Sequence, residues 1–253
     1  MAWQILSLKL ICWDEQTPGL DRLMVITDRF IYLHLHKSAG TFINEALLRF
    51  VPGAHMLGYH LPRSQIPAEL RHLPILGFVR NPWSYYVSWY AFQSNLPRQN
   101  HLFRCVSDAG RLGFQATICN LLSLGVDGAL LDRVMEGLPD TFTNVGLNLP
   151  RWALAPLRNS GQGFYSFLYR HIYGGSGSPL YVGRTESLQT DLLSFFESIN
   201  LRPSAELHGF VCRDAPRNTS PHEHYAEYYD SSLQTLVGVR DGDLIQSFDY
   251  RFG

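Results

Sequence analysis

The 253-residue sequence predicts an α/β fold: a single domain whose mainly parallel central sheet is flanked by helices. Short apolar runs at 30–35, 75–79 and 180–183 have the composition of strands buried on both faces. A helical pattern comes after each run, and strands that alternate with helices favour parallel pairing. The composition is that of a globular chain, because 45% of the residues are hydrophobic and only 17% are charged.

The first 23 residues differ in pattern from the rest of the chain. Residues 1–23 combine an alternating apolar run with a Pro18-Gly19 turn. We predict that they form an N-terminal extension with a candidate extra strand, and that residues 24–253 form one domain. Met24 is a second candidate for the natural start of the protein.

The helices are predicted from apolar stripes and from proline. Residues 41–50 place their apolar side chains on one helical stripe, and Pro82 suits the first position of a helix over 83–95. The later segments comprise helices within 111–172 with breaks at 125–128 and 139–150, a turn at 174–178, an amphipathic helix at 187–199, a polar loop at 213–224 and a last helix at 225–239.

Charge and cysteine content exclude several classes of protein. The formal net charge of −1 lacks the basic excess of a nucleic-acid binder. Cys12, Cys105, Cys119 and Cys212 form no CxxC pair, so we expect neither a zinc site nor a disulfide scaffold, and no other metal is expected. No run approaches the ~20 apolar residues of a spanning helix. We therefore expect a cytoplasmic protein that binds no membrane.

The loop after the first buried strand is the sharpest local signal. The chain has two lysines, Lys9 and Lys37, against nineteen arginines, and Lys37 lies in the turn HKSAGT (36–41). A turn between a strand and a helix N-terminus gathers free N–H groups and the positive end of the helix dipole, which favours an anion. The turn lacks the GxxxxGK[ST] spacing of ATP- and GTP-hydrolysing enzymes. The alternative is an ordinary turn with a solvated lysine.

A second candidate anion site lies after the second buried strand. Arg80 leaves the strand at the carboxyl edge of the sheet, where α/β proteins bind ligands. Ser84 and Ser88 are four residues apart, so they share a helix face and can join the Arg80 side chain on one anion. A salt bridge of Arg80 and a capped helix remain the alternative.

Together these motifs resemble the PAPS-dependent sulfotransferases, in the branch with HxPKTGGT-like and FVRNPxxRxxSxY-like motifs. The chain reads HLHKSAGTFI at 34–43 and GFVRNPWSYYVSWY at 77–90, and the order continues in YVGRTESLQTDL at 181–192. It departs from the pattern at His36, where the family has Pro, and at Ser84-Tyr85, where Asp-Arg is common. The resemblance implies a P-loop-like single domain with the sulfotransferase fold, and PAPS as sulfate donor with no metal required.

The resemblance also implies roles for individual residues. The 5′-phosphosulfate would be held by Lys37, Ser38, Ala39, Gly40, Thr41 and Phe42. The 3′-phosphate would be held by Arg80 and Ser88. The adenosine and its 3′-phosphate would be lined by the segment 181–186 and by Arg217, Asn218, Thr219 and Ser220. Lys37 would be catalytic, because a mobile cation can track charge that develops on the leaving oxygen.

The acceptor needs a base that removes its proton. We expect this base to be His60, with an ordinary pKa near ~6.5, and His222 and His224 are the competing candidates. Tyr85 and Trp89 are candidates for acceptor binding, although aromatic residues at helical spacing more often form a core.

The predicted function is therefore transfer of a sulfuryl group from PAPS to a hydroxyl, amine or guanidinium nitrogen of a small polar acceptor, such as a natural product. A carbohydrate sulfotransferase is the nearest alternative. A P-loop nucleotide kinase or NTPase and a non-catalytic nucleotide-binding module are alternatives of other classes. The acceptor and the oligomeric state are not determined by the sequence.

Overall fold

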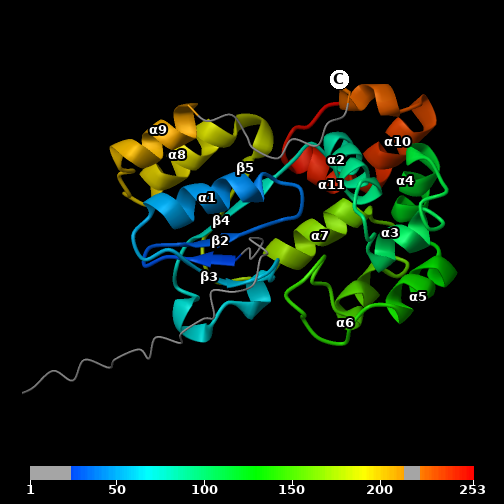
Figure 1. Ribbon diagram of the computed structural model, residues 1–253, viewed down its shortest axis with the longest axis horizontal. Helices are drawn as coiled ribbons and strands as arrows, with labels where there is room; N and C mark the ends of the chain where they lie inside the picture. The colour runs from blue at the N-terminus through cyan, green and yellow to red at the C-terminus, as the bar shows by residue number, and fades with distance from the viewer. Residues whose placement is uncertain (1–23, 214–222) are drawn as a thin grey trace, which may run out of the picture.

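Five short strands form one sheet in the order β3-β1-β2-β4-β5, in a computed structural model that describes residues 24–213 and 223–253 (Figure 1). The strands are Met24–Ile26 (β1), Ile31–Leu33 (β2), His55–Gly58 (β3), Ile75–Val79 (β4) and Leu180–Arg184 (β5). β2 pairs in parallel with β4, and β4 with β5, but β1 is antiparallel to both β2 and β3. The sheet is therefore mixed, and the expectation of a mainly parallel sheet is confirmed only in part.

The direction of the strands decides where the candidate residues lie. Because β1 is antiparallel to both of its neighbours, β3 runs in the same direction as β2, β4 and β5. The carboxyl ends of these four strands therefore meet at one edge of the sheet, where open α/β sheets bind ligands. The short antiparallel pair β1–β2 is closed by a tight turn in which the Thr27 N–H and hydroxyl both donate to the Phe30 carbonyl.

The helices are Gly40–Phe50 (α1), Pro82–Ser94 (α2), His101–Val106 (α3), Phe114–Ser123 (α4), Gly128–Glu136 (α5), Arg151–Leu154 (α6), Phe164–Tyr173 (α7), Leu188–Ser198 (α8), Ala205–Arg213 (α9), Ser231–Arg240 (α10) and Gly242–Ser247 (α11). The helices predicted at 41–50, 83–95 and 187–199 are confirmed as α1, α2 and α8. Pro82 opens α2, and the Asn81 side chain caps it by accepting from the N–H groups of Trp83 and Ser84.

Two hydrophobic clusters cover the two faces of the sheet. Alternate residues of a strand point to opposite faces, and β4 places Leu76 and Phe78 on one face and Ile75 and Val79 on the other. The first pair packs with α1, α8 and α9, which lie together above the sheet in Figure 1. The second pair belongs to the larger cluster, which joins the sheet to α2–α5, α7 and α10.

Among the described residues, no single helix has the length and apolar composition to cross a membrane. The pair α4 and α5 meets those two criteria only when joined, and it bends by 95° between its members.

Candidate anion-binding site

Four strand ends bring the candidate residues to the same edge of the sheet. The segment after β3 contacts the segment after β2, since His60 Nδ1 lies 2.9 Å from the carbonyl oxygen of His34. The segment after β4 contacts the segment after β5, since the Asn81 N–H donates to Glu186 Oε1 at 2.7 Å. Residues that are far apart in the sequence therefore form one site.

The loop after β2 turns sharply into α1. Lys37 and Ala39 both adopt the left-handed region, with φ of 60° and 59°, which side chains other than glycine seldom occupy. Ala39 is the N-cap of α1 and has no side-chain oxygen to accept from the first N–H groups of the helix. Those N–H groups and the helix dipole favour an anion at this point.

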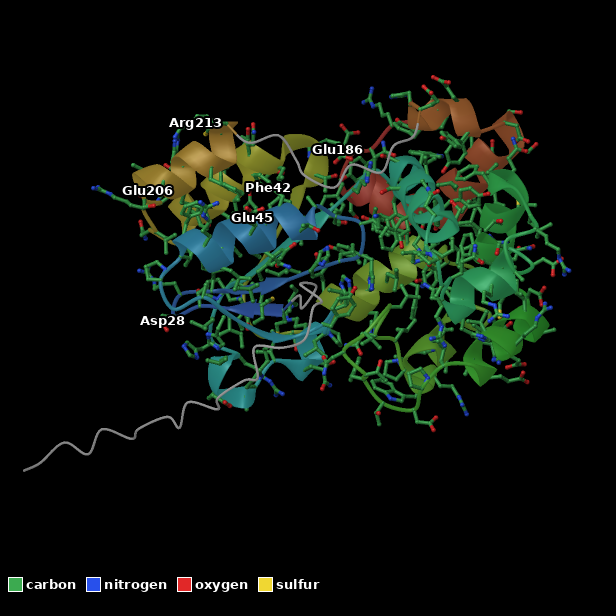
Figure 2. All side chains as sticks on the ribbon, viewed as in Figure 1. Asp28, Phe42, Glu45, Glu186, Glu206 and Arg213 are labelled. Atoms are coloured by element: carbon green, nitrogen blue, oxygen red, sulfur yellow. The ribbon has the colours of Figure 1, made fainter. Side chains whose placement is uncertain are left out.

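Gly40 is required by packing. A Cβ atom at this position would lie 2.0 Å from Nε2 of His34, so only glycine lets the His34 ring approach the start of α1. Phe42, labelled on α1 in Figure 2, is buried. Its ring stacks on Phe210 of α9 at 5.1 Å between centroids, so Phe42 can face a ligand only through its backbone.

Lys37 lies over α2 rather than in open solvent. Its Nζ is 4.2 Å from the centroid of the Phe92 ring. Burial and then the charge of Arg80 lower the pKa of Lys37 to about 8. In the described part of the chain, no carboxylate lies within ion-pair distance of this ammonium.

Arg80 is held at the other end of the same helix. Its Nε donates to Ser84 Oγ at 2.9 Å, and its backbone N–H donates to the Tyr165 hydroxyl at 2.8 Å. Burial lowers the pKa of Arg80, whereas the nearby Glu186 carboxylate raises it. Of the two serines expected to join Arg80 on one anion, Ser84 contacts the guanidinium directly, and Ser88 is buried one turn further along α2.

Two residues connect the segments of the site: Tyr165, which no sequence motif singles out, and Glu186, which ends the segment 181–186. The Tyr165 hydroxyl lies 3.4 Å from Ser38 Oγ as well as accepting from Arg80, so it joins the two anion-binding segments. Glu186 accepts from the Asn81 N–H and from the Tyr250 hydroxyl at 3.1 Å, which ties the end of the chain to the site. Tyr165 lies in the helical middle of the chain, where no motif indicates its role.

His60 is a buried member of a histidine stack. Its ring centroid lies 3.5 Å from that of His36 and 4.5 Å from that of His34. Burial lowers the pKa of His60 to about 3, so the expected ordinary pKa is wrong. Burial also lowers the pKa of His34 and His36, and the ring nitrogens of His34 find no hydrogen-bond partner among the described residues. The stack is neutral.

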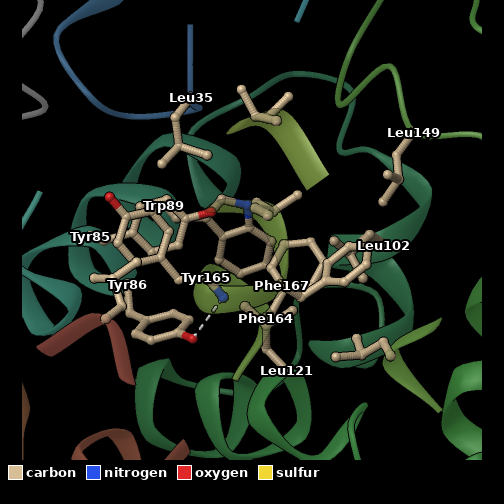
Figure 3. Close-up of a cluster of buried hydrophobic side chains, with 14 of the residues drawn as sticks. Leu35, Tyr85, Tyr86, Trp89, Leu102, Leu121, Leu149, Phe164, Tyr165 and Phe167 are labelled. Atoms are coloured by element: carbon tan, nitrogen blue, oxygen red, sulfur yellow. Dashed lines mark hydrogen bonds between the residues drawn. The ribbon is translucent and has the colours of Figure 1, made fainter. Parts of the chain in front are cut away.

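The other predicted site residues are distributed differently. Tyr85 and Trp89 are buried in the larger core, where Tyr85 stacks on Tyr165 at 3.7 Å (Figure 3), so neither lines a surface. His224 is exposed and packs on Tyr225. The remaining candidates lie outside the described residues: Arg217, Asn218, Thr219, Ser220 and His222.

No group of three or more His, Cys, Asp or Glu side chains that could hold a metal ion is present among the described residues. A surface hollow of about 530 Å³ lies at the opposite edge of the sheet, beside Arg29, Pro74 and Pro179, away from every candidate residue. This hollow is mostly apolar and open, in contrast to the two cations of the candidate site.

Comparison with protein-family models and with curated proteins gave no match for this chain.

Proposed function

We propose that this protein is a PAPS-dependent sulfotransferase with the sulfotransferase fold. The observation that carries the proposal is the placement of two cationic side chains along α2: Arg80 on Ser84 and Lys37 on Phe92. Ser84, Ser88 and Phe92 succeed one another at four-residue intervals, so they form a stripe of the helix about 12 Å long at 1.5 Å per residue. A ligand that suits this stripe carries two separate anionic groups.

PAPS has two such groups, a 5′-phosphosulfate and a 3′-phosphate. Lys37, Ser38 and the backbone at the N-terminus of α1 would hold the first group. Arg80 and Ser88 would hold the second, because a guanidinium binds phosphate with its planar fork. Both cations are half-buried, which strengthens their attraction for an anion because the local dielectric is lower than that of water.

In sulfuryl transfer the bond from sulfur to the bridging oxygen of the donor breaks as a bond from sulfur to the acceptor oxygen forms. Lys37 would stabilise the negative charge that develops on the bridging oxygen. The acceptor proton would pass to His60, whose Nδ1–H donates to the His34 carbonyl and leaves Nε2 as the basic atom. Anionic groups bound beside the histidine stack would raise its low pKa values towards those of a working base.

The charges of the site favour a hydroxyl as acceptor over an amine or guanidinium. Lys37 and Arg80 repel a cationic acceptor, and both oxygens of Glu186 are already engaged. Neutral imidazoles can both donate to and accept from a hydroxyl group. We therefore propose a hydroxylated small molecule as acceptor, and the net charge of −1 gives no reason to prefer a polyanionic glycan.

The test is PAP formation from PAPS in the presence of matched hydroxyl, amine and guanidinium compounds, with Lys37→Ala as the inactive control. The proposal predicts PAP release that depends on a hydroxylated acceptor and is lost in the variant. Release of phosphate from ATP with Mg²⁺, without any turnover of PAPS, would support the kinase or NTPase alternative. Binding of PAP without turnover of any acceptor would support the non-catalytic alternative.

A further inference from the structure

The Lys37 ammonium lies over the face of the Phe92 ring. The distance from Nζ to the ring centroid is 4.2 Å, which is within the range of a cation–π interaction. The Phe92 side chain is 43% exposed although it is large and apolar. It belongs to neither hydrophobic cluster, so its ring can be replaced without removing a core residue.

The environment of Lys37 explains why such a contact matters. Burial and Arg80 both disfavour the charged ammonium, and the neighbouring His34 is neutral. The described carboxylates form their ion pairs elsewhere. The lysine side chain is a flexible four-carbon stem, so without a partner its ammonium samples many positions. The aromatic face supplies attraction without neutralising the charge, so the ammonium stays available to an anion.

We propose that Phe92 is a positioning residue for Lys37: its ring holds the ammonium over α2, one turn beyond Ser88, before an anion binds. The contact itself is independent of the reaction, whereas its catalytic consequence rests on the proposed sulfotransferase function. A pre-positioned cation costs no reorganisation when charge develops in the transition state. Loss of the ring therefore lowers kcat rather than donor affinity.

The contact can be tested without any activity, because the chain has only two lysines. Reductive methylation with ¹³C-formaldehyde places NMR-visible methyl groups on Lys37, on Lys9 and on the N-terminal amine, and Lys9→Arg and Lys37→Arg variants assign the two lysine signals. The ring current of Phe92 shifts the Lys37 methyl signal upfield. Phe92→Leu moves this signal to the position of an ordinary exposed lysine, and Phe92→Tyr keeps it upfield. An identical Lys37 signal in the wild type and in Phe92→Leu overturns the proposal.

The catalytic consequence is measured as a division between kcat and KM. Phe92→Leu lowers kcat for sulfate transfer about fivefold, with KM for PAPS and the Kd for PAP unchanged, and Phe92→Tyr restores kcat. Phe50→Leu is the control for loss of a ring beside a cation, because it removes a ring from the Arg49 guanidinium at the far end of α1. The Phe50 ring also packs on Phe210 at 5.3 Å between centroids, so the free energy of unfolding of both variants is measured alongside kcat. An unchanged kcat in Phe92→Leu contradicts the positioning role.

The positioning role and the proposed function fail separately. If the upfield signal depends on Phe92 but PAP does not bind in calorimetry, the sulfotransferase proposal is wrong and the contact stands. If PAPS is turned over but neither the signal nor kcat depends on Phe92, the positioning role is wrong and the proposed function stands.

Discussion

The hydroxyl of Tyr165 accepts a hydrogen bond from the backbone N–H of Arg80 at 2.8 Å and so fixes the start of the segment that carries the guanidinium. The same hydroxyl lies 3.4 Å from Ser38 Oγ in the loop after β2. One buried phenol on α7 therefore sets the spacing of two loops that leave neighbouring parallel strands. The affinity for a ligand with two anionic groups would therefore depend on this spacing.

Tyr165→Phe removes the hydroxyl and leaves the ring stacked on Tyr85. The Arg80 N–H then lacks its acceptor, so we expect the free energy of unfolding to fall by about 1–2 kcal/mol and PAP affinity to fall about tenfold. Urea denaturation and calorimetry measure the two effects. Tyr85→Phe is the control, because the Tyr85 hydroxyl has no partner among the described residues and its loss should cost little. Equal effects of the two variants would contradict the role of Tyr165.

The lowered pKa of Lys37 predicts how the rate depends on pH. Its pKa of about 8 means that the free enzyme loses the ammonium as the pH rises through that value. Since kcat/KM reports ionisation of the free enzyme, kcat/KM for PAPS should fall about tenfold per pH unit above pH 8. Lys37→Arg keeps its charge, so its weaker activity should lack this decline. A wild-type profile that stays flat to about pH 9.5 would exclude Lys37 as the required cation.

We expect Glu186→Ala and Glu186→Gln to differ in their effect on the free energy of unfolding. Glu186→Ala leaves the Asn81 N–H and the Tyr250 hydroxyl without an acceptor, so we expect a loss of about 2 kcal/mol in the free energy of unfolding. Glu186→Gln can still accept from Asn81 and donate to Tyr250, so its loss should stay below about 1 kcal/mol. Urea denaturation measures both values. If Glu186→Gln lost as much free energy of unfolding as Glu186→Ala, the charge of Glu186 and not its hydrogen bonds would be the source of its effect.

The buried histidines predict sensitivity to acid. Burial lowers the folded-state pKa of His34, His36 and His60, and that of His171 to about 4. Between these values and the unfolded pKa near ~6.5, the unfolded chain binds more protons, so stability falls as the pH falls. We expect on the order of 1–2 kcal/mol per histidine to be lost between about pH 7 and pH 5.

Urea denaturation across this range measures the acid effect, and His171→Gln should reduce the slope. Asp241 has the opposite effect on stability as the pH falls, because burial raises the pKa of its carboxyl in the folded state. A free energy of unfolding that does not change between about pH 7 and pH 5 would show that the histidines are not buried as described.

The elements that could be predicted from the sequence are those with a local signal. β4 matches the predicted 75–79 because five apolar residues are buried on both faces. The start of α2 matches because Pro82 and Asn81 are local signals. β1 and β3 were not predicted, because the apolar run around β1 is shorter than the run 30–35 around β2, and β3 is partly exposed with a polar first residue. The mixed pairing results from β1 alone.

In the candidate site, too, only the residues with a local sequence signal could be predicted. The positions of Lys37 and Arg80 at the carboxyl ends of neighbouring parallel strands could be predicted, because each comes after a strand that the sequence marks clearly. The low pKa of His60 could not, since it depends on burial against two other histidines. Tyr165 lies 127 positions from Ser38 and 85 from Arg80, so no local pattern indicates that it joins them.

The central claim is that Lys37 and Arg80 hold a donor with two anionic groups, and calorimetric titration tests it most directly. PAP, ADP and ATP are titrated without and with Mg²⁺ into the wild type and into Arg80→Gln. We predict that PAP binds without Mg²⁺, at least about tenfold more tightly than ADP, and that Arg80→Gln removes this preference. Preference for ATP with Mg²⁺, with no response to the 3′-phosphate, would contradict the claim.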